Sequence, residues 1–458
     1  MIETLEQKHS LPRWRRILLW LVLTAMVLLG LVILASYIVG RRLGAEIVKI
    51  SEAGEPLTFS DLAKANSPES TTQEDAARYY IEALMSIGPA SLPNLQRVNT
   101  FYRQNISSLP TNQLPNDLRD SVTQNLAVSE PIFEKFDKGA GLALSSFDIG
   151  IRQGIEVCKT RLKRVETATF LLSLRTLDLI LRGEDDAAAN SAISMLKMMR
   201  IFDSHPTMIL NTIKTGFVGL ACEDIHVLLE RGRPSDESLA KLEKVLSETI
   251  PANVLERTLL AERVYQMEIG RNLIPENIVS QFLQGEVPNL PERISLPGSF
   301  GGRLRLRQKA RGYFRDMARL ITTSRQPWPG PLDIIVGNMS EATKKRNRLM
   351  TSATNITQLT AAALTAVRCT ALAVAIERYR HGTGELPGSL DDLAPTYIDS
   401  ISLDPFTGKN LLYNRDEESY TVYSAGTNRK DDAGSIKPKA DEKISLDLGL
   451  RIRVGKVE

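Results

Sequence analysis

The sequence holds few residues with the spacing of a catalytic or metal-binding site. The strongest arrangement is Cys222-Glu223-x-x-His226, which places a thiol and an imidazole four positions apart. On a helix this spacing puts both side chains on one face, where they could bind a metal ion. A closed site needs two more ligands, and His205 is the one other nearby candidate. We favour the simpler interpretation, in which the pair packs in a helical core.

Motifs of the common enzyme classes are absent from the sequence. It contains no Gly-rich phosphate loop, no G-x-S-x-G nucleophile elbow and no H-E-x-x-H zinc motif. The candidates for general-base catalysis by histidine are His9, His205, His226 and His381. The three cysteines are too far apart to outline a disulfide framework: Cys158, Cys222 and Cys369. The sequence therefore predicts no enzymatic activity and no cofactor.

Several charged clusters could contact a partner. One basic run includes two aromatic residues and consists of Arg303, Arg305, Arg307, Lys309, Arg311, Tyr313, Phe314, Arg315 and Arg319. Lys344-Lys345-Arg346 with Arg348 forms a second. Such runs can touch anionic lipid headgroups, although a solvated helix face explains both more simply. The net charge of +3 is too small to indicate a nucleic-acid partner.

The elements that position these residues begin with an uncharged apolar stretch from Ile17 to Gly40. About 20 such residues in a helix cross the hydrocarbon core of a bilayer. A cleaved signal peptide is the alternative, but its apolar region is usually shorter, and Arg41-Arg42 follows this one. The sequence therefore predicts a single-pass signal anchor.

Basic residues flank this span unequally. Lys8, Arg13, Arg15 and Arg16 precede it more densely than Arg41, Arg42 and Lys49 follow it. By the positive-inside rule we expect a cytoplasmic N-terminus and an exported body. The predicted location is the inner membrane of a bacterial cell, with the bulk of the chain in the periplasm.

The rest of the chain is predicted to be mainly α with a small α+β module at the C-terminal end. We expect a cytoplasmic N-terminus at 1–16, a transmembrane helix at 17–40, a linker at 41–72, an α-helical domain at 73–330 and the module at 331–458. Apolar spacing indicates an array of αα-hairpins, similar to helical-repeat packing, with helices over 155–179, 187–201, 206–229 and 236–246.

The C-terminal module combines a long helix with strands. A long helical pattern runs from about Leu332 to Arg380 and ends at a Gly- and Pro-containing segment. Residues 411–413 and 420–424 have strand character, and residues 444–454 alternate apolar and polar side chains. We expect one helix face to pack on this antiparallel sheet through Leu364, Val367, Leu372 and Ile376.

The order of motifs in this module resembles a known family. It runs through Ala371-Leu372-x-x-Ala375-Ile376, Gly384-x-Leu386-Pro387, Asp404-Pro405-x-x-Gly408 and Tyr423-Ser424-x-Gly426. This order is similar to the globular end of the major pseudopilins of type II secretion systems, over about residues 355–435. The resemblance implies a helix packed on a small antiparallel sheet. It also implies a calcium ion in the loop that follows Tyr423, with Asn428, Asp431 and Asp432 as candidate ligands.

The sequence departs from that family at its N-terminal end. Pseudopilins join the membrane segment directly to the packed helix, whereas here a large helical region separates the two. No prepilin-peptidase site of the Gly-Phe-Thr-Leu-x-Glu type precedes the span. We therefore expect a permanently anchored protein that carries a pseudopilin-like module, rather than a standard pilus subunit.

Three functions remain open at this point. The first is a structural or protein-interaction role in the cell envelope, with the module docked on a type II secretion or pilus-like assembly. The second is a binding module for an exported peptide or glycan, held in a groove of the helical array. The third is an envelope hydrolase that uses carboxylates. A groove lined by aromatic residues would favour the second, and a pocket with two facing acids would favour the third.

Overall fold

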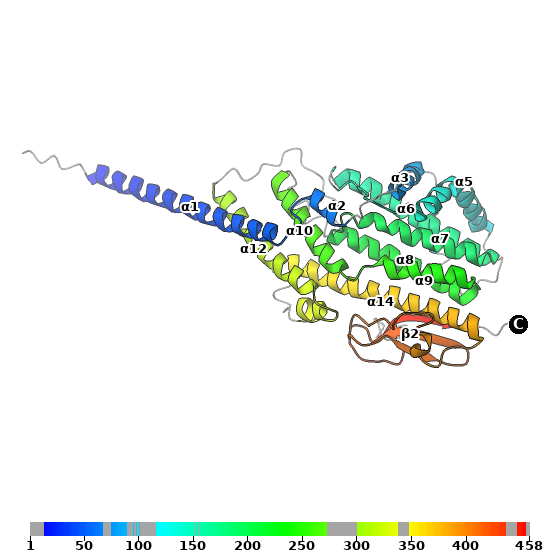
Figure 1. Cartoon of the computed structure of the whole chain (residues 1–458). Coiled ribbons are helices and arrows are strands. Elements are labelled where there is room, and N and C mark those ends of the chain that lie inside the picture. Colours follow the sequence, from blue (N-terminus) through cyan, green and yellow to red (C-terminus); the bar gives the residue numbers. More distant parts are fainter. Residues whose placement is uncertain are drawn as a thin grey trace, which may run out of the picture. The chain divides into compact units, whose positions relative to one another are not determined.

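The computed structural model describes residues 13–66, 75–88, 95, 98, 100, 116–151, 153, 155–272, 300–337, 348–436 and 447–454. The chain forms two compact units, one from residues 1–55 with 272–319 and the other from residues 56–271 with 320–458. The described part is mainly helical, as the sequence predicts (Figure 1). Its helices are α1 (Arg13–Glu52), α2 (Phe59–Asn66), α3 (Ala76–Ser86), α5 (Asn116–Ala140), α6 (Ile155–Arg182), α7 (Asp185–Met198), η1 (Met199–Phe202), α8 (Met208–Arg231), α9 (Asp236–Thr249), α10 (Val254–Asn272), α12 (Phe300–Ser324), η2 (Leu332–Gly337), α14 (Arg348–Thr383) and η3 (Leu390–Leu393). Its strands are β1 (Leu412–Arg415), β2 (Ser419–Ser424) and β3 (Leu448–Arg453).

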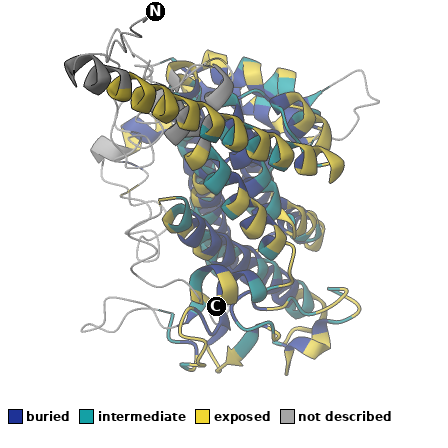
Figure 2. Cartoon of the chain, turned by 90° about the vertical axis from the view of Figure 1, so that its left-hand side faces the viewer, coloured by how far each residue is buried: buried dark blue, intermediate teal, exposed yellow. Residues whose placement is uncertain are grey.

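Helix α1 holds the apolar stretch at the N-terminal end. It is longer than the predicted span and continues past Arg41 and Arg42 to Glu52. Figure 2 shows its described surface as almost continuously exposed. Two helices of the described part, α1 and α14, are long and apolar enough to cross a membrane. Their burial separates them, because none of the apolar window of α1 is buried, against 67% of that of α14. An N-terminal apolar helix of this kind is consistent with a signal anchor or a signal sequence.

Helices α6 to α9 lie close to the ranges predicted for the αα-hairpins. Short turns separate α6 from α7 and α8 from α9, because Gly183 takes a positive φ of 72° and the Ser235 hydroxyl accepts a hydrogen bond from the Ser238 amide. Acidic residues at the start of α7 also connect the α6–α7 turn to the α8–α9 turn by hydrogen bonds. Asp185 and Asp186 accept hydrogen bonds from the Arg233 and Ser235 amides, at 2.6 and 2.7 Å.

Helix α14 is the central element of the second unit. It packs against α8 and α9 on one side and against β2 and β3 on the other, and Figure 1 shows it between these layers. The four residues predicted to face the sheet, Leu364, Val367, Leu372 and Ile376, are all buried in one hydrophobic core with strand residues. The contacts of α14 with β2 and β3 confirm the predicted packing of the long helix on the sheet.

The sheet has three antiparallel strands in the order β1-β2-β3. Val422 on the central strand pairs with Tyr413 on one side and with Leu450 on the other. Every residue of β2 is buried, whereas β3 buries Leu450 and Ile452 and exposes the residues beside them. This alternation is the pattern predicted for the last strand, of which residues 444–446 lie outside the described part.

Two segments differ from the sequence-based expectation. Residues 41–72, predicted as a linker, contain the end of α1 and the whole of α2. Helix α2 forms because Phe59 and Leu62, three positions apart, bury one face against α10 residues Ala261 and Val264. The long helix predicted from Leu332 is described as η2 followed by α14, with 338–347 outside the described residues. The helical and C-terminal segments share one compact unit through α14.

Replacing a buried residue of α14 tests this arrangement. Ile376 has no exposed surface, so Ile376→Ala leaves a cavity and should lower the free energy of unfolding by about 2–5 kcal/mol. Chemical denaturation of the detergent-solubilised chain, followed by circular dichroism, measures the loss. Val128→Ala on α5 is the control, because Val128 is 58% exposed and its replacement should change stability by less than about 0.5 kcal/mol. Equal effects of the two variants would contradict a doubly packed α14.

Candidate functional site

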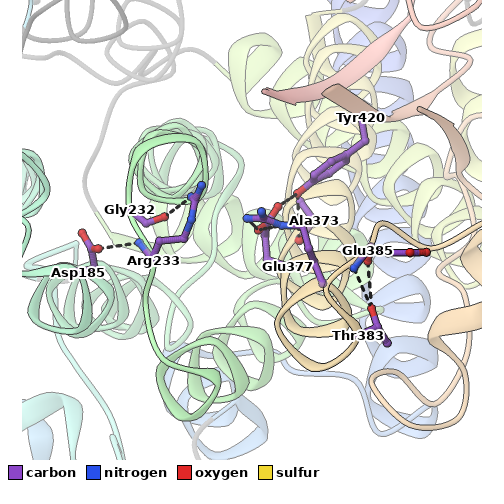
Figure 3. A network of polar contacts seen from close by, with 9 residues as sticks. Asp185, Gly232, Arg233, Ala373, Glu377, Thr383, Glu385 and Tyr420 are labelled. Atoms are coloured by element: carbon purple, nitrogen blue, oxygen red, sulfur yellow. Dashed lines mark hydrogen bonds and ion pairs between the residues drawn. The ribbon is translucent and has the colours of Figure 1, made fainter. Parts of the chain in front are cut away.

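A buried polar network joins α14 to the central strand of the sheet (Figure 3). The Tyr420 hydroxyl shares its one hydrogen between Glu377 Oε1 at 3.0 Å and the Ala373 carbonyl oxygen at 3.3 Å. Arg380 Nε donates to Glu377 Oε2 at 2.9 Å. Burial, and then the Glu377 carboxylate, raise the pKa of Tyr420, so the phenol stays protonated and donates. The arrangement fixes the helix on the sheet and offers no free acid or base.

The loop that carries the predicted calcium ligands follows β2. Asn428 Nδ2 donates to Asp432 Oδ2 at 2.7 Å, so two of the three predicted residues contact one another. Asp431 Oδ1 accepts from the Tyr423 hydroxyl at 3.0 Å and from the Ala433 amide at 2.9 Å. The loop is therefore organised by hydrogen bonds to its own acidic side chains.

Asp447, just before β3, closes the same loop. Its carboxylate accepts hydrogen bonds from the amides of Asp432, Gly434 and Ser435, the shortest being 2.9 Å to Gly434. A calcium ion takes six to eight oxygen ligands. Within the described residues, no three His, Cys, Asp or Glu side chains form a group that could hold a metal ion. The carboxylate oxygens of this loop accept hydrogen bonds from backbone amides and side chains. A calcium site at Asn428, Asp431 and Asp432 stays a prediction.

The Cys222 and His226 pair lies where α8 packs on α14. His226 Nε2 is 2.9 Å from Thr370 Oγ1, and that hydroxyl itself donates to the Ala366 carbonyl oxygen at 2.8 Å. A threonine hydroxyl has one hydrogen, so when Thr370 donates to the Ala366 carbonyl oxygen, His226 donates to Thr370 from Nε2. Burial raises the pKa of the Cys222 thiol to about 12 and lowers that of His226 to about 4. Both groups are therefore neutral packing residues at pH 7.

His205, the third member of the predicted metal set, lies elsewhere. It precedes the first residue of α8, whereas His226 is close to the other end of that helix. At 1.5 Å per residue, the helix separates them by roughly 27 Å. The His205 ring instead makes an edge contact with Phe59, at 5.5 Å between ring centroids. The structure therefore does not bring His205 to the Cys222 and His226 pair.

The predicted basic run belongs to α12. Lys309, Arg315 and Arg319 are exposed, whereas Phe314 and Met317 are buried. The side chains of Arg303, Arg305 and Arg307 lie outside the described residues, as does Lys344-Lys345-Arg346. One basic and one apolar face are the pattern of a solvated helix that packs on one side.

The described surface also contains a polar pocket of about 290 Å³. Its lining includes the acids Asp203 and Glu248 and the cations Arg200 and Arg257. Asp203 is held by the buried Lys214 ammonium at 2.6 Å, and Arg257 donates to the Asp203 carbonyl oxygen at 3.0 Å. Since Asp203 already balances a buried charge, it is engaged in the fold rather than poised as a general base.

A larger groove of about 570 Å³ lies between α6 and α8. We call it the α6–α8 groove, and it is lined by Lys159, Leu162, Lys163, Glu166, Phe170, Thr212, Ile213, Gly216, Phe217 and Leu220. Sequence reasoning did not identify it. The sequence does contain one signal, because small and apolar residues from Thr212 to Leu220 share one face of α8. The charged face of α6 does not fully cover this face.

Known proteins add no identification to this geometry. No family model matches the chain, and no curated protein or solved structure is similar to it. The class is therefore defined by the fold alone, as a helical body and a helix-on-sheet module that share α14, with an apolar helix at the N-terminal end.

The partly buried His226 gives this structure a specific pH dependence. His226 has a pKa of about 4 in the fold against 6.5 for an ordinary histidine, so the unfolded chain binds more protons between these values. Its contribution to stability is complete above pH 6.5 and is lost as the pH falls towards 4. We expect His226→Gln, which keeps a donor for Thr370, to reduce the loss by about 2 kcal/mol. Urea denaturation of both proteins at pH 7.5, 5.5 and 4.5 measures the difference, and parallel pH profiles would contradict it.

Proposed function

We propose that this chain is a membrane-anchored protein of a bacterial cell envelope with a structural or protein-interaction role. The observation that carries the proposal is the difference in burial between α1 and the apolar helices of the second unit. None of the apolar window of α1 is buried, while the second unit buries its own apolar helices in one extended core. A long apolar helix whose side chains are not buried in a protein core is suited to a bilayer. The polar groups described above are engaged in structural contacts, which supports interaction over catalysis.

We further propose that the C-terminal module docks on a type II secretion or pilus-like assembly. Support comes from the motif order that resembles the major pseudopilins and from the packing of α14 on a three-stranded antiparallel sheet. The exposed Leu403 side chain, 52% accessible in the loop before β1, offers an apolar contact on this module. In this proposal α1 spans the inner membrane, the N-terminus is cytoplasmic and the body is periplasmic.

The membrane topology can be tested with the cysteines. All three native cysteines are buried, so an introduced Val128→Cys on α5 would carry the main accessible thiol. We expect a membrane-impermeant maleimide to label it in cells with a permeabilised outer membrane but intact inner membrane. An N-terminal epitope tag should remain on the full-length chain. Labelling only after lysis would place the body in the cytoplasm, and loss of the tag would indicate a cleaved signal sequence.

Site-specific photo-crosslinking tests the docking role. A photoreactive amino acid at Leu403 should crosslink the chain to a pilin-like or secretion-system component in the native host. The same residue placed at Val128, which is 58% exposed on the helical body, is the matched control. Crosslinks from both positions to the same proteins, or from neither, would contradict docking through the C-terminal module.

A further inference from the structure

The wall that α8 contributes to the α6–α8 groove is apolar and open. Ile213, Phe217 and Leu220 lie on it at helical spacing, with Gly216 between them. A Cβ atom added at Gly216 would meet no heavy atom within 4 Å. The helix therefore lacks a side chain at the point where one would fill the groove.

The wall that α6 contributes changes character along the helix. Lys159 and Lys163 lie one turn apart, Glu166 follows, and Phe170 lies one turn further on. Lys163 pairs with Glu166 at 2.8 Å, while Lys159 pairs at 3.0 Å with Glu156, which is not part of the lining. One end of this wall is thus basic and the other aromatic, so the lining has two cations and one anion.

The size of the groove limits what it can hold. Its volume of about 570 Å³ lies within the range of small-molecule sites, roughly 300–1,000 Å³. A methylene group is close in size to a water molecule, which occupies roughly 30 Å³ in the liquid. The groove therefore has room for a single acyl chain of fewer than about 20 carbons, and a two-chain lipid would exceed it.

We propose that the α6–α8 groove binds a single-chain anionic amphiphile, a long-chain fatty acid. The acyl chain lies along Ile213, Phe217 and Leu220 towards Phe170, where burial of apolar surface supplies the affinity. The carboxylate lies at the end of α6 that carries Lys159 and Lys163, where an ammonium group can exchange its glutamate partner for the ligand. This site is independent of the proposed docking through the C-terminal module, because its residues belong to α6 and α8 alone.

The test uses the full chain in nanodiscs of zwitterionic phospholipid, with a palmitate analogue that carries a photoreactive diazirine near the end of its chain. We expect the analogue to label peptides of α6 and α8. Gly216→Trp fills the groove and should reduce this labelling at least tenfold. Gly219→Trp is the matched control, because Gly219 lies on the same helix, has no heavy atom within 4 Å of an added Cβ and does not line the groove. It should leave labelling within twofold.

Both variants place tryptophan where the helix has glycine. Tryptophan has a higher helix propensity than glycine, so neither change should weaken the helix on that ground. Thermal denaturation monitors their folding, and Gly216→Leu is the second, smaller replacement should Gly216→Trp unfold. Competition tests the charge: palmitate should displace the probe more strongly than hexadecyltrimethylammonium. Lys159→Gln with Lys163→Gln should abolish this preference.

Four outcomes would overturn the proposal. They are labelling confined to α1, labelling insensitive to the residue at position 216, equal competition by the cationic amphiphile, and protection of the groove by an acidic amphipathic peptide with no protection by palmitate. The last outcome would assign the groove to a partner helix instead.

Discussion

The second unit depends on the burial of α14 from two sides at once. From Ala353 to Glu377 most of its positions are buried, and they point in all directions around the helix axis. A helix that is apolar all round is stable only inside a protein or a membrane. Here α8 and α9 cover one side and the sheet covers the other. The helical body and the module are consequently held by the same residues, and neither has a complete core without α14.

Polar contacts set the position of α14 between its two neighbours. Glu377 accepts hydrogen bonds from Tyr420 on the sheet side, and the next residue, Arg378, binds Asp236 and Glu243 of α9 at 2.9 and 2.7 Å. A slip of one residue would direct each side chain to the wrong layer and leave a buried carboxylate without donors. Apolar burial thus supplies most of the stability, and Glu377 and Arg378 fix the position of α14 along and around its own axis.

The fold was largely predictable from the sequence, whereas the sites were not. Apolar spacing gave α6 to α9 to within a few residues, and the alternation near the C-terminal end gave β3, because both patterns reflect which face is buried. Helix α2 escaped prediction, since the two residues that stabilise it depend on a partner helix about two hundred residues away. Sequence reasoning also named His205 as a third ligand for Cys222 and His226, although the helix predicted over 206–229 already separates His205 from His226. The α6–α8 groove was missed because the small and apolar face of residues 212–220 does not show by itself which helix lies opposite and how much of that face it leaves open.

The long sequence separation between β3 and the helices it contacts has a consequence for synthesis. This strand pairs with β2 and also contacts α8, more than two hundred residues earlier in the chain. Helices α6 to α9 can form local hairpins as they emerge, but the sheet cannot close until β3 has left the ribosome. A chain interrupted before β3 would therefore leave the sheet-facing side of α14 incompletely covered, and quality-control proteases would meet exposed apolar residues of a long helix.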